Sequence, residues 1–346
     1  MGELHDLSLG GKLSIQGLRN VGSLFEARHA NLMGKKDLQE LSLSWRNNGE
    51  TETPTTTAEQ VLEVLQPHSN LKRLKILYYD GLCLPKWIGF LNSLVDLQLQ
   101  YCNNCVLSSL GKLPSLKKLE LWGMNNMQYM DNAEYHDGVE VRAFPSLEKL
   151  LLVGLQNIER LLKVQIRDMF LLLSNLTIID CPKLVLPCLP SLKDLIVFGC
   201  NNELLRSISN LCSLTTLHLL NGEDVTCFPD GMLKNLTCLQ SLKISNFPKL
   251  KKLPNEPFNL ALECLSISSC GELESIPEQT WEALLSLRTI DIGYCGGLRS
   301  FPESIRHLTS LEFLKIRGCP TLKERCKKGT GEDWDKIAHI PKLHVD

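Results

Sequence analysis

The sequence lacks any long apolar run and carries almost no net charge. Apolar residues make up 43% of the 346, yet no stretch approaches the roughly 18 consecutive apolar residues that a membrane-spanning helix requires. Its 37 basic and 39 acidic residues nearly cancel, which argues against a surface built for nucleic acid or anionic membranes. The opening residues, MGELHDLSLGGKL, also lack the basic and then apolar pattern of a secretory signal.

The sequence also lacks the common catalytic and cofactor-binding motifs. It contains no G-x-x-x-x-G-K-[ST] phosphate loop, no H-E-x-x-H and no G-x-S-x-G. One C-x-x-C is present, at Cys102 and Cys105, but a zinc site needs a second pair at suitable spacing. We therefore expect no enzymatic activity and no cofactor or metal in this chain.

What the sequence does contain is a repeat, clearest between Leu262 and Leu322. This stretch holds three aligned copies, LECLSISSCGEL, LRTIDIGYCGGL and LEFLKIRGCPTL. Each copy has apolar residues at positions 1, 4 and 6, cysteine at 9 and leucine at 12. The position-4 residues Leu265, Ile290 and Leu314 lie 25 and 24 residues apart. A period of roughly 20 to 29 with this pattern is the signature of a leucine-rich repeat, in which each unit supplies one short strand.

The same frame extends through most of the chain and predicts about thirteen repeats. Positions 4 and 6 of the predicted strands are Leu13/Ile15, Leu41/Leu43, Leu74/Ile76, Leu97/Leu99, Leu119/Leu121, Leu150/Leu152, Leu176/Ile178, Leu195/Val197, Leu217/Leu219, Leu242/Ile244, Leu265/Ile267, Ile290/Ile292 and Leu314/Ile316. Stacked units of this kind share one continuous core. The predicted fold is an α/β solenoid, a horseshoe with a concave parallel sheet and an irregular or short-helical convex side.

The repeat pattern also sets the expected domain boundaries. We expect the array to cover residues 1–322, with irregular insertions near 46–60 and 124–143, and a capping segment over 323–346. In that tail, Trp334, Ile337 and Ala338 have the spacing of a short amphipathic helix. Because the array begins without an N-terminal cap, we expect this chain to be a piece of a longer protein.

The cysteines follow the repeat. Six of the fourteen occupy position 9: Cys102, Cys181, Cys200, Cys270, Cys295 and Cys319. That position turns inward, and a free cysteine packs there as a small hydrophobic side chain. Without a secretory signal, we interpret all fourteen as reduced thiols in a cytoplasmic environment.

The predicted sheet surface offers a candidate binding site. Side chains alternate along a strand, so positions 3, 5 and 7 point outward where positions 4 and 6 point into the core. Five adjacent repeats have apolar residues at position 7, and two of these also have one at position 5. The predicted apolar stripe consists of Trp122, Leu151, Val153, Ile179, Ile196, Phe198 and Leu220. A contiguous apolar patch of this size favours a protein-binding surface, with Trp122 and Phe198 as aromatic anchors.

Two alternatives remain open for this stripe. Another domain of a longer parent protein would cover the same surface without any foreign partner. Alternatively, the frame slips where the spacing is least regular, between Leu119 and Leu195, and a slip of one residue turns these side chains inward.

Three stretches carry a resemblance to a known family. GELHDLSLGGKLSIQGLRNV, KKDLQELSLSW and the ending LKERCKKGTGEDWDKIAHIP resemble the carboxy-terminal region of plant nucleotide-binding leucine-rich-repeat disease-resistance receptors, of the coiled-coil class called resistance gene analogues. The resemblance covers essentially the whole chain. The coiled coil and the nucleotide-binding domain of that family are absent from these residues.

The resemblance implies an intracellular, cytoplasmic immune receptor that acts in plant defence. Its repeats would recognise a pathogen effector or a guarded host protein and would hold the parent's nucleotide-binding domain at rest. ADP or ATP would bind in that upstream domain and not in this chain. The alternative function is a substrate-recognition repeat subunit of a ubiquitin ligase, which an upstream F-box segment would identify. Neither function involves nucleic acid or a membrane span.

Overall fold

A computed structural model describes residues 4–5, 9–46, 56–107, 110–131, 143–164, 169–254, 261–282 and 284–346. The chain divides into two compact units, Met1–Ser174 and Asn175–Asp346. Most of both predicted insertions, residues 47–55 and 132–142, lies outside the described residues.

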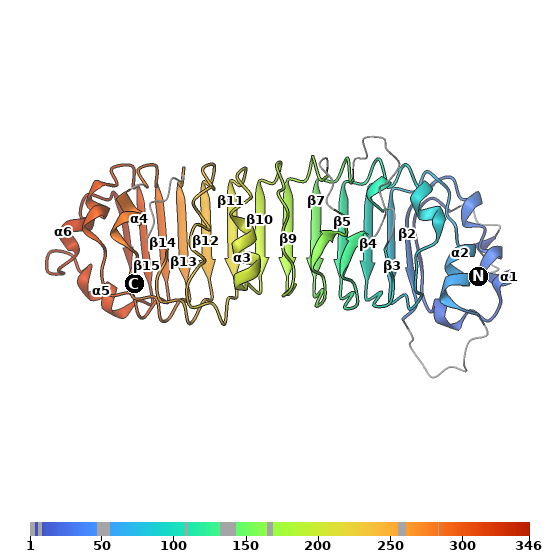
Figure 1. The fold of residues 1–346 in the computed structure, drawn as a ribbon, viewed down its shortest axis with the longest axis horizontal. Helices are drawn as coiled ribbons and strands as arrows, with labels where there is room; N and C mark the ends of the chain where they lie inside the picture. Colours follow the sequence, from blue (N-terminus) through green and yellow to red (C-terminus); the bar gives the residue numbers. More distant parts are fainter. Residues whose placement is uncertain are drawn as a thin grey trace. The chain divides into compact units, whose positions relative to one another are not determined.

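The first unit is built on a parallel sheet whose strands pair in the order β1-β2-β3-β4-β5-β7 (Figure 1). These strands are β1 (Gly11–Ile15), β2 (Leu38–Ser44), β3 (Arg73–Leu77), β4 (Asp96–Gln100), β5 (Lys118–Trp122) and β7 (Lys149–Val153). Two short strands, β6 (Tyr129–Asp131) and β8 (Arg160–Leu162), pair with each other in a separate parallel sheet. The returning segments contain η2 (Leu18–Asn20), α1 (Leu24–His29), η3 (Leu32–Gly34), α2 (Ala58–Val64), η4 (Lys86–Phe90) and η5 (Leu110–Lys112).

The second unit repeats this architecture, with parallel strands that pair in chain order from β9 to β16. They are β9 (Asn175–Ile179), β10 (Asp194–Phe198), β11 (Thr216–Leu220), β12 (Ser241–Ser245), β13 (Cys264–Ser268), β14 (Thr289–Gly293), β15 (Phe313–Arg317) and β16 (Lys342–Val345). The returns carry α3 (Asn202–Ile208), α4 (Glu278–Glu282) and η6 (Glu303–His307), and the tail adds α5 (Pro320–Arg325) and α6 (Trp334–Ile337). The predicted leucine-rich-repeat solenoid is therefore confirmed.

Each strand forms because its position-4 and position-6 side chains are aliphatic and pack on those of the next repeat. Leu265, Ile290 and Leu314 pair in register across β13, β14 and β15, and all three are at most 2% exposed. Every predicted strand centre from Leu13 to Ile316 falls within a strand. The frame read from the sequence is thus correct throughout, including the irregular spacings.

The strands end where the residue at position 8 adopts a left-handed backbone conformation. Tyr101, Asn221 and Tyr294 all have φ values between 55° and 63°, which turns the chain off the sheet. Where a glycine takes this place, its missing side chain also matters. In Gly318, with φ of 60°, a Cβ would lie 2.6 Å from the ring of Tyr294 in the preceding repeat.

The position-9 thiols are buried directly after this turn, as the pattern predicts. Cys102, Cys270 and Cys319 each donate to the carbonyl two residues earlier, all at 3.4 Å. Burial raises the pKa of the Cys102 thiol to about 12, and Cys200 is affected in the same way. These two thiols are therefore protonated hydrophobic groups of the core.

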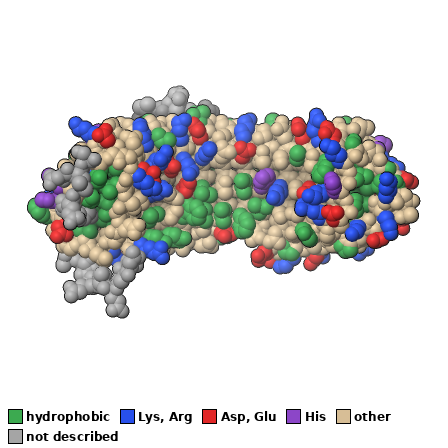
Figure 2. Space-filling model, turned by 180° about the vertical axis from the view of Figure 1, so that it is seen from behind, with side chains coloured by type: hydrophobic (Ala, Val, Ile, Leu, Met, Phe, Trp, Pro, Cys, Tyr) green, Lys and Arg blue, Asp and Glu red, His purple; other side chains and the backbone are tan. Residues whose placement is uncertain are grey.

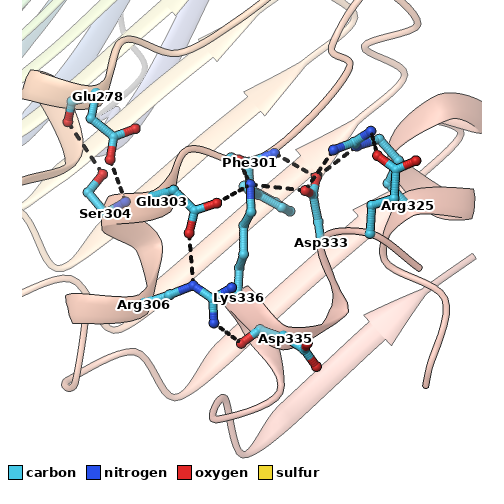
Figure 3. Close-up of polar contacts among 10 residues, drawn as sticks. Glu278, Phe301, Glu303, Ser304, Arg306, Arg325, Asp333, Asp335 and Lys336 are labelled. Carbon is cyan, nitrogen blue, oxygen red and sulfur yellow. Dashed lines mark hydrogen bonds and ion pairs between the residues drawn. The ribbon is translucent and has the colours of Figure 1, made fainter. Parts of the chain in front are cut away.

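The tail is attached to the last repeats by a buried carboxylate, Asp333 (Figure 3). Its Oδ2 accepts from the backbone amide of Phe301 at 3.0 Å, and its two oxygens accept from Arg325 at 3.0 and 3.1 Å. Lys336 lies 3.1 Å from Oδ1 and also donates to the Phe301 carbonyl at 2.9 Å. The network joins α5 and α6 to the segment that leads into η6. After α6, the chain returns to the sheet, where β16 pairs with β15.

Candidate functional site

The open face of each sheet is defined here as the surface that carries the side chains of positions 3, 5 and 7. In the first unit, this face holds the apolar residues Trp122, Leu151 and Val153. Trp122 pairs in register with Val153, and Glu120 pairs with Leu151. All three apolar side chains are partly exposed, whereas their strand neighbours Leu121 and Leu152 are fully buried. We refer to these three residues as the first patch.

A polar network borders the first patch and holds Trp122 in place. The indole Nε1 of Trp122 donates to Glu120 Oε2 at 3.4 Å, and Gln98 donates to the same oxygen at 2.9 Å. Lys118 forms an ion pair with the other oxygen of Glu120. Glu120 itself is only 9% exposed. The anchor is therefore preorganised, because its polar atom already has a partner while its side chain stays partly exposed.

In the second unit, the open face holds Ile179, Ile196, Phe198 and Leu220, which we call the second patch. Ile179, Phe198 and Leu220 occupy one row across β9, β10 and β11 in register. Ile196 lies beside this row on β10. Phe198 is 38% exposed, and its strand neighbour Val197 is 0% exposed. A phenylalanine held this far out of a sheet is available for contact with another molecule.

Titratable and charged side chains also lie on the strands of both units. Next to the second patch, His218 on β11 pairs in register with Lys243 on β12. Burial and the charge of Lys243 lower the pKa of the His218 imidazole, against the opposing effect of Asp194. In the first unit, Glu40 interacts with Lys12, Arg73 and Lys75 at 3.0 to 3.7 Å. Figure 2 shows hydrophobic and charged side chains on one side of the molecule.

The structure places all seven predicted stripe residues on the open face. It thereby excludes the frame-slip alternative, because a slip would have buried them. The structure assigns three of them to one unit and four to the other.

A stacked aromatic row in the first unit was missed by the sequence analysis. Tyr78 and Tyr101 lie in position 8 of adjacent repeats, with ring centroids 5.0 Å apart and an interplanar angle of 14°. Arg46 lies over the Tyr78 ring at 5.5 Å from its centroid. Both rings are at least 36% exposed. The signal was present in the sequence, since two tyrosines recur 23 residues apart at the same repeat position.

The described residues offer no arrangement suited to metal-dependent chemistry. No cluster of three or more histidine, cysteine, aspartate or glutamate side chains in this part of the chain has the geometry to hold a metal ion. Cys102 and Cys105 are both buried, and burial raises the pKa of each thiol. Nor does any helix in the described ranges reach the length and hydrophobicity needed to cross a bilayer.

Comparison with known proteins connects this architecture to a family. The family model described as R13L1/DRL21 LRRs matches residues 1–124. A disease resistance protein of Solanum bulbocastanum, RGA1, is 40% identical over 348 residues, which covers 99% of this chain. The chain belongs to the leucine-rich-repeat regions of plant disease-resistance proteins. A second relative from the same plant, RGA2, is 38% identical over 353 residues. The resemblance seen in the sequence is confirmed.

The match covers only part of each relative. This resistance-protein repeat region spans 35% of RGA1 and 34% of RGA2. Among solved structures, the TLR13-ssRNA13 complex matches with a TM-score of 0.53 and 17% identity, over 96% of this chain and 54% of that one. At this identity, the likeness concerns the fold alone.

Proposed function

We propose that this chain is the recognition and autoinhibitory repeat region of a cytoplasmic plant immune receptor, and that the first and second patches bind protein. The ligands are a pathogen effector or a guarded host protein, together with the nucleotide-binding domain of the parent protein. ADP or ATP binds in that upstream domain. The relatives, which are named as disease resistance proteins, favour this function over a ubiquitin-ligase subunit.

The main support for the proposal is that apolar side chains occupy positions 5 and 7, which do not contribute to the core. Position 7 in β10 is Phe198, at 38% exposure, while the core in the same strand is complete with Leu195 and Val197 at 0%. Exposed apolar groups of this size lower solubility unless a partner covers them. Trp122 and Phe198 are also the residue types that dominate binding energy in protein interfaces.

The patches suit an interface better than a small-molecule site. Both lie on an open sheet surface, and neither is enclosed by other described elements. Around the first patch, Glu120, Gln98 and Lys118 supply a polar border, as is typical of the rim of a protein interface. A partner is expected to present apolar groups at its centre and polar groups at its periphery.

The test uses the part of RGA2 outside the matched region as the binding partner. This polypeptide and the full chain are expressed separately, and their affinity is measured by biolayer interferometry. We expect Trp122→Ala and Phe198→Ala each to weaken binding by about tenfold or more, as interface anchors do.

The matched control is Phe90→Ala, which removes a phenylalanine that is 70% exposed in η4, away from the open face. This variant should bind as the unaltered chain does. Equal loss in all three variants, or no loss in either patch variant, contradicts the proposal. Circular dichroism of each variant separates a loss of contact from a loss of fold.

A further inference from the structure

The open face of the second unit changes from apolar to polar after β11. In register with Leu220 of the second patch, position 7 on β12 to β15 is occupied by Ser245, Ser268, Gly293 and Arg317. The Oγ atoms of Ser245 and Ser268 share a hydrogen bond at 2.8 Å. A polar surface with short side chains therefore adjoins the second patch on the same face, and a cationic residue lies at its far side.

Position 5 on the same four strands carries two lysines and one aspartate. Lys243 on β12 and Lys315 on β15 are separated by Ser266 and Asp291. Neither lysine forms an ion pair within the part of the chain that the structure describes, whereas Arg317 Nη2 contacts both carboxylate oxygens of Asp291, at 3.1 and 3.3 Å. We refer to Lys243, Lys315 and Arg317 as the cationic strip.

The cationic strip has an excess of positive charge on a chain whose formal net charge is only -2. Asp291 is the one acidic residue at positions 3, 5 and 7 of β12 to β15, and Arg317 already pairs with it. The charges of Lys243 and Lys315 are therefore left without a counterion on this face. A local excess of one sign attracts groups of the opposite sign and steers their approach.

The cationic strip lies within reach of a segment that contacts the second patch. Lys243 is two strands away from Phe198 on β10, and Lys315 and Arg317 are five strands away. Because neighbouring strands lie about 4.8 Å apart, these separations are about 10 and 24 Å along the sheet, which roughly three and seven residues of extended chain span. One continuous segment can therefore contact both surfaces.

We propose that the cationic strip binds an acidic segment of the protein partner whose apolar residues contact the second patch. This inference rests on the proposed function and adds the charge of the partner to it. Carboxylates close to the partner's apolar residues contact Lys243, and those farther along contact Lys315 and Arg317. The apolar contact supplies affinity, while the charges raise the association rate and select acidic partners over basic ones.

The experiment measures binding of a fluorescein-labelled peptide, Phe-Leu-Gly-Glu-Glu-Ser-Asp-Glu-Glu, to the full chain by fluorescence anisotropy. We expect saturable binding that weakens as salt concentration rises, because salt screens the attraction between exposed charges. A peptide with lysine in place of every acidic residue should not bind.

Charge reversal in the cationic strip tests which residues attract the peptide. Lys243→Glu together with Lys315→Glu should weaken binding by about tenfold or more. The matched control is Lys234→Glu together with Lys251→Glu, which changes the net charge equally at two exposed lysines outside positions 3, 5 and 7. This control should change binding by less than about twofold. The neutral pair Lys243→Gln and Lys315→Gln should give an intermediate loss and a weaker dependence on salt, and circular dichroism verifies the fold of each variant.

Phe198→Ala separates this inference from the proposed function. Loss of peptide binding in Phe198→Ala but not in the Lys243 and Lys315 variants overturns the role of the cationic strip and supports the second patch. Loss in the lysine variants alone supports the strip and contradicts the role of the second patch. Absence of saturable binding, or an equal loss in the control pair, overturns the inference. Tighter binding of a short oligothymidylate that requires both lysines also overturns it, since the ligand is then a nucleic acid.

Discussion

At the scale of the residue, adjacent side chains along each strand alternate between the buried core and the open face. Val197 is 0% exposed and Phe198 is 38% exposed, although they are adjacent. This alternation was predictable, because leucine or isoleucine at positions 4 and 6 fixes which side faces the core. The contacts around each outward residue were not predictable. The hydrogen bonds from Trp122 and Gln98 to Glu120 join neighbouring strands, and only the register reveals them.

His218 provides a prediction on pH dependence at this scale. Its pKa is lowered, mainly by burial and further by Lys243, so folding favours the neutral imidazole. The stabilisation is complete above the ordinary pKa of about 6.5 and is lost as pH falls through that value toward the lowered one. We expect His218→Gln, which does not titrate, to lose less stability than the unaltered chain between about pH 7.5 and about pH 5. Urea unfolding at both pH values measures these losses. Equal losses of unfolding free energy in His218→Gln and in the unaltered chain would contradict the prediction.

At the scale of the element, the strands of the array followed from sequence but the tail did not. The L-x-x-L-x-L frame located every strand from β1 to β15 except β6 and β8. It missed β16, because KLHV has only two aliphatic residues and becomes a strand through pairing with β15. The frame also missed β6 and β8, which pair within the return segments. The helix at Trp334 was predicted, whereas the network that holds it depends on residues distant in the chain.

The Asp333 network gives a prediction for the tail. Burial alone would raise the pKa of the Asp333 carboxyl, but Arg325, the Phe301 amide and Lys336 together lower it. Asp333→Asn removes one partner of a buried ion pair and should cost about 3 kcal/mol or more in unfolding free energy. Because the folded pKa is lowered, this contribution is present above the ordinary pKa and is lost as pH falls.

The control for Asp333→Asn is Asp335→Asn. Asp335 is exposed and accepts from Arg306 through its backbone carbonyl, at 2.7 Å, so the substitution should change stability by less than about 0.5 kcal/mol. Urea unfolding near pH 7 measures both variants. Similar small changes in the two would show that the tail does not depend on the buried carboxylate.

At the scale of the whole molecule, stability is distributed along the repeats. Each repeat packs on its neighbours through positions 4 and 6, as Leu265, Ile290 and Leu314 do, so a defect should remain local. The architecture was predictable because one pattern recurs many times, so an irregular repeat is placed correctly by its agreement with the others. The binding surface was predictable only in outline, since its partners lie outside the chain.

Ile290→Ala tests this distribution. The cavity should cost about 2 to 5 kcal/mol locally and should increase hydrogen exchange in β13, β14 and β15, while exchange in β2 to β4 stays unchanged. Ser266→Ala, on the open face of β13, is the control and should leave exchange as it was. Hydrogen–deuterium exchange with mass spectrometry measures both, and a uniform increase along the chain would contradict a repeat-by-repeat architecture.

The most direct test of protein binding by the open face is site-specific photocrosslinking. A benzoylphenylalanine is placed at Phe198, or at Phe90 as the control, in an RGA1 protein whose matching region is replaced by this chain. The account predicts crosslinks from position 198 to another protein or to the receptor's own upstream domain, and none from position 90. Crosslinks from position 90 alone, or from neither position, would contradict it.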